Sequence, residues 1–69
     1  MTAKRFASLP DQSKSNLLRH YANLKMGWNR KEFGLSKSRI NELIGFQRAI
    51  AACGITNEQF LAHADRRQQ

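Results

Sequence analysis

Residues 31–44 read KEFGLSKSRINELI and predict a tight turn that leads into a helix. Gly34 permits the turn because glycine has no side chain to restrict its backbone. Leu35 supplies an apolar plug for the corner, and Ser36 is of the type that caps helix N-termini. Apolar residues from Ile40 onward would hold the new helix against the rest of the protein. This arrangement is typical of the second half of a helix-turn-helix.

A polar capping residue between two apolar residues occurs three times, at Asn29, Ser36 and Thr56. Such a residue fixes a helix N-terminus, and Glu or Gln three positions later completes a reciprocal capping box. Glu32 and Gln59 complete boxes for the first and third of them. A glycine adjoins each helix start and serves as a stop or a turn: Gly27, Gly34 and Gly54.

These signals predict four helices and no strand. Upstream of the turn, apolar residues recur at helical spacings of three and four, from Leu17 to Trp28. We expect helices at about 11–26, 30–33, 37–53 and 57–66. The predicted fold is all-α, a small bundle of three main helices plus one short helix that contains the helix-turn-helix. Residues 1–9 lack periodicity, so we expect a flexible basic arm before a single helical domain over residues 10–69.

The third expected helix carries a broad apolar face that begins at Ile40 and includes Cys53, which we expect to be buried. Gly45 costs up to about 1 kcal/mol in a helix interior, so close packing of another helix is a reason to keep it. Ala49 and Ala52 extend this strip of small residues. The exposed part of the apolar surface formed by the helices at about 37–53 and 57–66 is the expected interface of a possible homodimer.

The chain is strongly basic, with 12 Lys and Arg against five Asp and Glu and a net charge of +7 over 69 residues. Residues 1–48 hold ten of these bases and three acids, whereas residues 49–69 are balanced. A basic region beside a neutral one indicates that one side meets a polyanion. Nucleic-acid phosphate is the commonest such partner, and an acidic protein surface is the next.

The turn and the helix that follows it resemble those of the Cro-type repressors of the phage Cro/CI family. The shared pattern is a glycine, an aliphatic residue, two polar residues, a serine, one further residue and then Ile40-Asn41. Leu18 followed by Tyr21-Ala22 is similar to the first helix of that family, so the resemblance covers residues 17–44. It implies a sequence-specific transcription regulator that reads the major groove of double-stranded DNA with the helix at about 37–53.

That resemblance also implies roles for individual residues. The exposed start of the reading helix would face base edges, where Asn pairs with adenine, Lys with guanine and Glu with cytosine. These base-reading candidates are Ser36, Lys37, Ser38, Asn41 and Glu42. Phosphate contacts would come from flanking cations, which are Lys14, Arg19, Lys25, Arg30, Lys31, Arg39 and Arg48.

A second hypothesis is a small phage- or plasmid-type inhibitor or adaptor that binds protein. Its basic face would block an acidic or nucleic-acid-binding surface of a host protein. Arg30 stands where the repressors usually have a small apolar residue, and the helix at 30–33 is short. Both departures favour this alternative, because a protein-binding module does not need the helix geometry that fits a DNA groove.

No enzyme is predicted from this sequence. The residues Cys53, His20 and His63 lack metal-binding spacing, and the carboxylates are scattered, so neither a metal site nor a catalytic pair is expected. We therefore expect no cofactor and no small-molecule substrate. The chain has no apolar run long enough for a membrane span, and its single cysteine fits a reducing cytoplasm.

Overall fold

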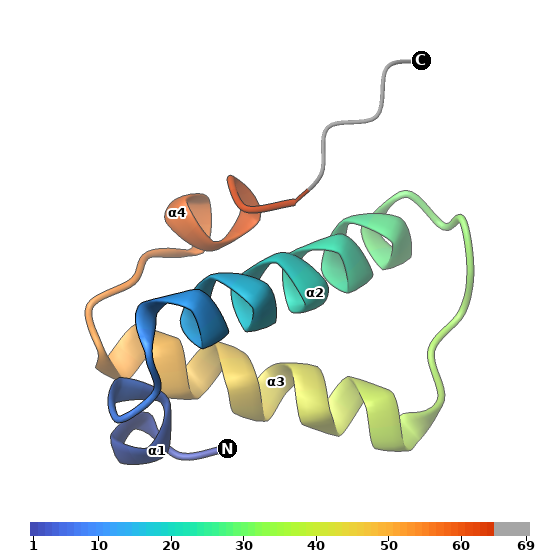
Figure 1. Ribbon diagram of the computed structural model, residues 1–69. Coiled ribbons are helices and arrows are strands. Elements are labelled where there is room, and N and C mark those ends of the chain that lie inside the picture. Colours follow the sequence, from blue (N-terminus) through green and yellow to red (C-terminus); the bar gives the residue numbers. More distant parts are fainter. Residues whose placement is uncertain (65–69) are drawn as a thin grey trace.

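The computed structural model describes residues 1–64, and these form helices joined by turns and loops, with no strand (Figure 1). The predicted all-α class is therefore confirmed. The helices are α1 (Ala3–Ala7), α2 (Asp11–Asn29), α3 (Lys37–Ala52) and α4 (Asn57–Leu61). Two of them are long and two are short, so the expected three main helices are reduced to two.

The two long helices form the centre of the fold. In Figure 1, α2 and α3 run side by side in opposite directions and are joined at one end by residues 30–36. The short helix α1 packs against α3, and α4 packs against α2. Both short helices lie away from the 30–36 connection (Figure 1).

An aromatic cluster fills the space between the helices. Phe46 of α3 lies at its centre, with its ring stacked on Tyr21 at a centroid distance of 4.3 Å. Phe6 meets Phe46 edge-on at 5.7 Å, and Phe60 lies 5.9 Å away at a tilt. Because Phe6 and Phe60 belong to α1 and α4, the two short helices are held by one aromatic anchor each, a contact worth roughly 0.5–1.5 kcal/mol beyond buried area.

The N-terminal segment is a helix, so the prediction of a flexible arm over residues 1–9 is wrong. Thr2 caps α1, with its hydroxyl oxygen accepting a hydrogen bond from the Arg5 amide at 3.1 Å. Phe6 is only 2% exposed. One turn of helix with one buried residue is too short to show a period in sequence, and the burial of Phe6 is what holds it.

Helix α2 continues past the predicted stop at Gly27 and ends at Asn29. Its last carbonyls are satisfied by a Schellman turn, in which the Lys31 amide donates to the Trp28 carbonyl and the Glu32 amide to the Gly27 carbonyl. Lys31 takes the left-handed conformation at the centre of this turn, with φ of 60°. The sharp reversal therefore occurs at a lysine, whereas it was predicted at Gly34.

The short helix expected at 30–33 is absent, because those residues form the turn that ends α2. Asn29 is the last residue of α2 and does not cap a new helix. The helix-turn-helix is not confirmed, since α2 and α3 form an antiparallel hairpin (Figure 1).

The two remaining capping predictions are confirmed. Ser36 accepts from the Arg39 amide at 3.3 Å at the start of α3. Thr56 and Gln59 form the reciprocal capping box at the start of α4. Gly54, with φ of 88°, ends α3 in a second Schellman turn. Helix α4 stops at Leu61, and the final residues of the predicted 57–66 helix lie outside the described part of the chain.

Two further expectations about α3 are wrong. Cys53 is exposed, and its thiol donates to the Ala3 carbonyl at 3.4 Å. A side chain at Gly45 would meet nothing within 4 Å, so no close helix packing explains this glycine. The neighbour at the C-terminal half of α3 is the short helix α1, which the sequence did not reveal.

Candidate nucleic-acid interface

The connection between the two long helices gathers positive charge at one end of the molecule. Residues 30–36 join the end of α2 to the start of α3, and the two helices diverge toward this connection (Figure 1). Five cations and the two carboxylates Glu32 and Glu42 lie in this region of the sequence. We call it the basic end, and its cations are Lys25, Arg30, Lys31, Lys37 and Arg39.

All five predicted base-reading residues lie in the first turns of α3 or at its cap, and all are exposed. Ser36 has a structural role, since its hydroxyl caps the helix. Lys37, Ser38 and Asn41 are covered by no other part of residues 1–64. The first turn contains no acidic residue, so nothing there offsets the positive end of the helix dipole.

The seven predicted phosphate-binding residues are not all brought together. Four of them belong to the basic end, namely Lys25, Arg30, Lys31 and Arg39. Lys14 lies toward the opposite end of α2, where its ammonium sits 5.9 Å from the Phe6 ring centroid. Arg19 is exposed near the middle of α2, and Arg48 is exposed in the second half of α3.

Two surface ion pairs lie at the basic end. Arg30 and Glu32 approach to 3.9 Å, as do Arg39 and Glu42 one turn apart on α3. All four side chains are more than half exposed. Such pairs contribute about 0–1 kcal/mol, so a phosphate could displace either carboxylate at little cost.

Two aromatic side chains border these cations, and the sequence reasoning assigned neither of them to a site. The Lys25 ammonium lies 5.0 Å from the centroid of the half-buried Trp28 ring. Phe33 is 43% exposed, and its ring lies directly against Gly27 in α2. No signal in the sequence distinguished Phe33, because its contact with Gly27 is tertiary and Gly27 itself was predicted to end the helix.

Tyr21 connects the core to the surface at the start of α3. Burial raises the pKa of its hydroxyl above the ordinary value of 10.0, and the negative charge of Glu42 raises this pKa further. The positive charge of Arg39 acts in the opposite direction. The first turns of α3 are thus coupled electrostatically to a residue that stacks on Phe46.

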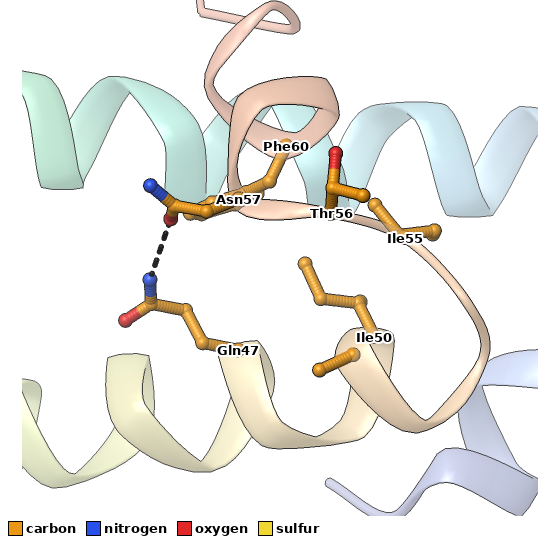
Figure 2. A pocket seen from close by; sticks show the side chains of 7 residues that line it. Gln47, Ile50, Ile55, Thr56, Asn57 and Phe60 are labelled. Carbon is orange, nitrogen blue, oxygen red and sulfur yellow. Dashed lines mark hydrogen bonds between the residues drawn. The ribbon is translucent and has the colours of Figure 1, made fainter.

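A pocket of about 190 Å³ lies between α3 and α4, away from the basic end (Figure 2). The pocket lining includes apolar side chains, among them Ile50 and Phe60. At its edge the Gln47 amide donates to the Asn57 side-chain oxygen at 3.4 Å, as Figure 2 shows. Its polar side chains are amides and one hydroxyl, which can bind by hydrogen bonds but do not titrate in water.

Within residues 1–64, no three His, Cys, Asp or Glu side chains are grouped closely enough to hold a metal ion. In the same part of the chain, none of the helices combines the length and the apolar character of a membrane span. Comparisons with protein-family models, curated proteins and solved structures gave no match to this chain. Its function is therefore argued from the geometry and charge described above.

Proposed function

We propose that this protein binds DNA at its basic end, holding phosphates with the clustered cations and facing the bases with the first turns of α3. The observation that carries the proposal is the exposure of Lys37, Ser38 and Asn41 beside four further cations. Cations in the first turn of a helix oppose its dipole. Their presence there favours a role in binding over a role in stability.

Phosphate contacts would supply most of the affinity. Each phosphate neutralised by a cation releases counterions, so the logarithm of the binding constant falls with the logarithm of salt, at about 0.9 per contact for duplex DNA. Five cations at one end set an upper limit of roughly four to five for this slope. If positive charge acted over the whole surface without a defined site, removing a cation at the basic end would lower this slope no more than removing one elsewhere.

Base contacts would supply the selectivity. Asn41 can pair with adenine and Lys37 with guanine, and both lie on the exposed side of α3. In the form that the sequence predicts, α3 enters the major groove as the reading helix of a transcription regulator, and a second copy increases affinity. The proposal does not need a helix-turn-helix, since a wide major groove admits the end of any exposed helix.

The test compares two lysines that differ in location. Binding of labelled DNA of mixed sequence is measured by fluorescence anisotropy from about 50 to 200 mM salt. Lys37→Gln should weaken binding and lower the salt slope by about 1. Lys14→Gln is the matched control, because Lys14 lies about 20 Å along α2 from the basic end, and it should change neither quantity. A wild-type protein that forms no complex at about 50 mM salt would refute DNA binding.

A protein-binding inhibitor or adaptor is the second candidate. The absence of a helix at 30–33 favours it, because the hairpin lacks the short helix that directly precedes the reading helix of a helix-turn-helix and crosses the DNA backbone. The partner would be an acidic surface of a host protein that meets the basic end. Pull-down with and without nuclease separates the candidates, since a protein partner is retained after nuclease treatment and a DNA-bridged one is lost.

A further inference from the structure

Phe33 is an aromatic side chain that does not pack into the hydrophobic core. Of the six Phe, Tyr and Trp residues, all of them within the described residues, Phe33 is the only one classed as exposed. Three phenylalanines are buried in the core, and Tyr21 stacks on one of them. Trp28 is half-buried and has the Lys25 ammonium over its ring.

Phe33 is also held in position. Its ring occupies the space that a Cβ atom at residue 27 would take, so α2 accommodates it with a glycine in the interior of the helix. Glycine at an interior position disfavours the helix relative to alanine. An ordered ring loses little conformational freedom on binding, so less of the gain from a contact with the ring is offset by lost entropy.

The charges around Phe33 define what such a ligand must be. In the chain, Lys31 and Lys37 flank Phe33, and its ring rests on Gly27 in the last turn of α2, with Lys25 two residues before Gly27 and Arg30 capping the helix. Carboxylates in this region are outnumbered by cations. The ligand therefore combines negative charge with an aromatic face, and a nucleotide in a strand provides both.

We infer that the basic end takes an unpaired nucleobase, which stacks on the Phe33 ring while the cations hold the adjoining phosphates. The inference rests on the proposed DNA binding and names its substrate class as DNA with unpaired bases, a single strand in the simplest case. Bases inside a duplex stack on each other and present only their edges, so they cannot cover the ring. Stacking of a base on an aromatic side chain strengthens binding by about 5- to 150-fold.

The experiment measures anisotropy of a labelled single strand of mixed sequence and of the duplex made from it, at about 50 mM salt. The single strand should bind at least about 5-fold more tightly than the duplex. Phe33→Leu, which keeps an apolar side chain, should remove this advantage, and Phe33→Tyr, which keeps a ring, should retain it. Met1→Ala is the matched control, because Met1 is 50% exposed, against 43% for Phe33, and precedes α1, which lies away from the basic end (Figure 1).

Gly27→Ala is a second probe, since its methyl group displaces the ring without removing it. It should weaken single-strand binding while the duplex affinity stays constant. Equal affinity for strand and duplex, or an unchanged affinity in both Phe33→Leu and Gly27→Ala, would overturn the stacking inference and leave DNA binding in place. If the wild-type protein bound neither the single strand nor the duplex, the proposed function would be overturned, and the inference with it.

Discussion

The ring of Phe33 lies on Gly27 and fills the position of its absent side chain. This contact joins the 30–36 connection to α2 and explains why a glycine stands inside a 19-residue helix. This pair of residues thus determines the place of the exposed aromatic ring, while the turn at Lys31 ends α2.

The first prediction concerns this pair. Gly27→Ala should give no gain in the free energy of unfolding in the wild-type protein, because the new methyl group expels the Phe33 ring. In a Phe33→Ala background the same change should stabilise the protein by about 1 kcal/mol, the difference in helix propensity. Urea unfolding of the four proteins of this double-mutant cycle measures the coupling. Additive effects would show that the two residues do not compete for the same space.

The second prediction concerns Lys31. A non-glycine residue with φ of 60° costs about 1 kcal/mol relative to glycine, so Lys31→Gly should raise the free energy of unfolding by about that amount. Arg30→Gly is the matched control, since it removes an equal charge at an ordinary φ of −84° and should destabilise. If both variants shifted the urea midpoint alike, the turn geometry would not be the cause.

Local signals predicted much of the fold. The starts of α3 and α4 follow from Ser36 and Thr56, because a capping hydroxyl acts within three residues of its own position. The end of α2 could not be predicted in this way. Lys31 takes a conformation that its residue type disfavours, and it does so because the adjoining turn satisfies the last carbonyls of α2.

The candidate site was predicted in part. That the start of α3 is exposed follows from its polar pattern, and residues 36–42 are indeed exposed or half-buried. The separation of Lys14 from Lys25 follows from the predicted helix, whereas the antiparallel pairing of α2 with α3 and the absence of a helix at 30–33 were not predicted. Phe33 was missed for a similar reason, since only the tertiary contact with Gly27 distinguishes it from a core residue.

The third prediction tests the helix at the N-terminus. Phe6→Ala should cost about 3–5 kcal/mol in the free energy of unfolding, because Phe6 is fully packed against Phe46. Met1→Ala is the control, since Met1 is half exposed, and it should change stability by less than about 0.5 kcal/mol. Thermal unfolding followed by circular dichroism measures both. Equal melting temperatures for the two variants would show that Phe6 does not hold residues 1–9 against the rest of the protein.

The fourth prediction concerns pH. The pKa of Tyr21 is raised in the folded protein, chiefly by burial and then by Glu42, so the folded state retains its proton to higher pH than the unfolded chain does. Between the ordinary value of 10.0 and the raised pKa, the folded state therefore binds more protons, and the free energy of unfolding falls as pH rises. Below that window the contribution of Tyr21 is fully present.

Tyr21→Phe keeps the ring that stacks on Phe46 and removes the ionising hydroxyl. The variant should lose less stability than the wild-type protein when urea unfolding is repeated from pH 8 to pH 11, a range about the ordinary pKa of tyrosine. Every other ionisable group is common to both proteins, so its effect cancels in the difference. Glu42→Gln should lower the pKa of Tyr21, because it removes the charge that opposes ionisation. Stability curves of wild type and Tyr21→Phe that run parallel above pH 10 would show that the Tyr21 hydroxyl ionises equally easily in the folded and unfolded states.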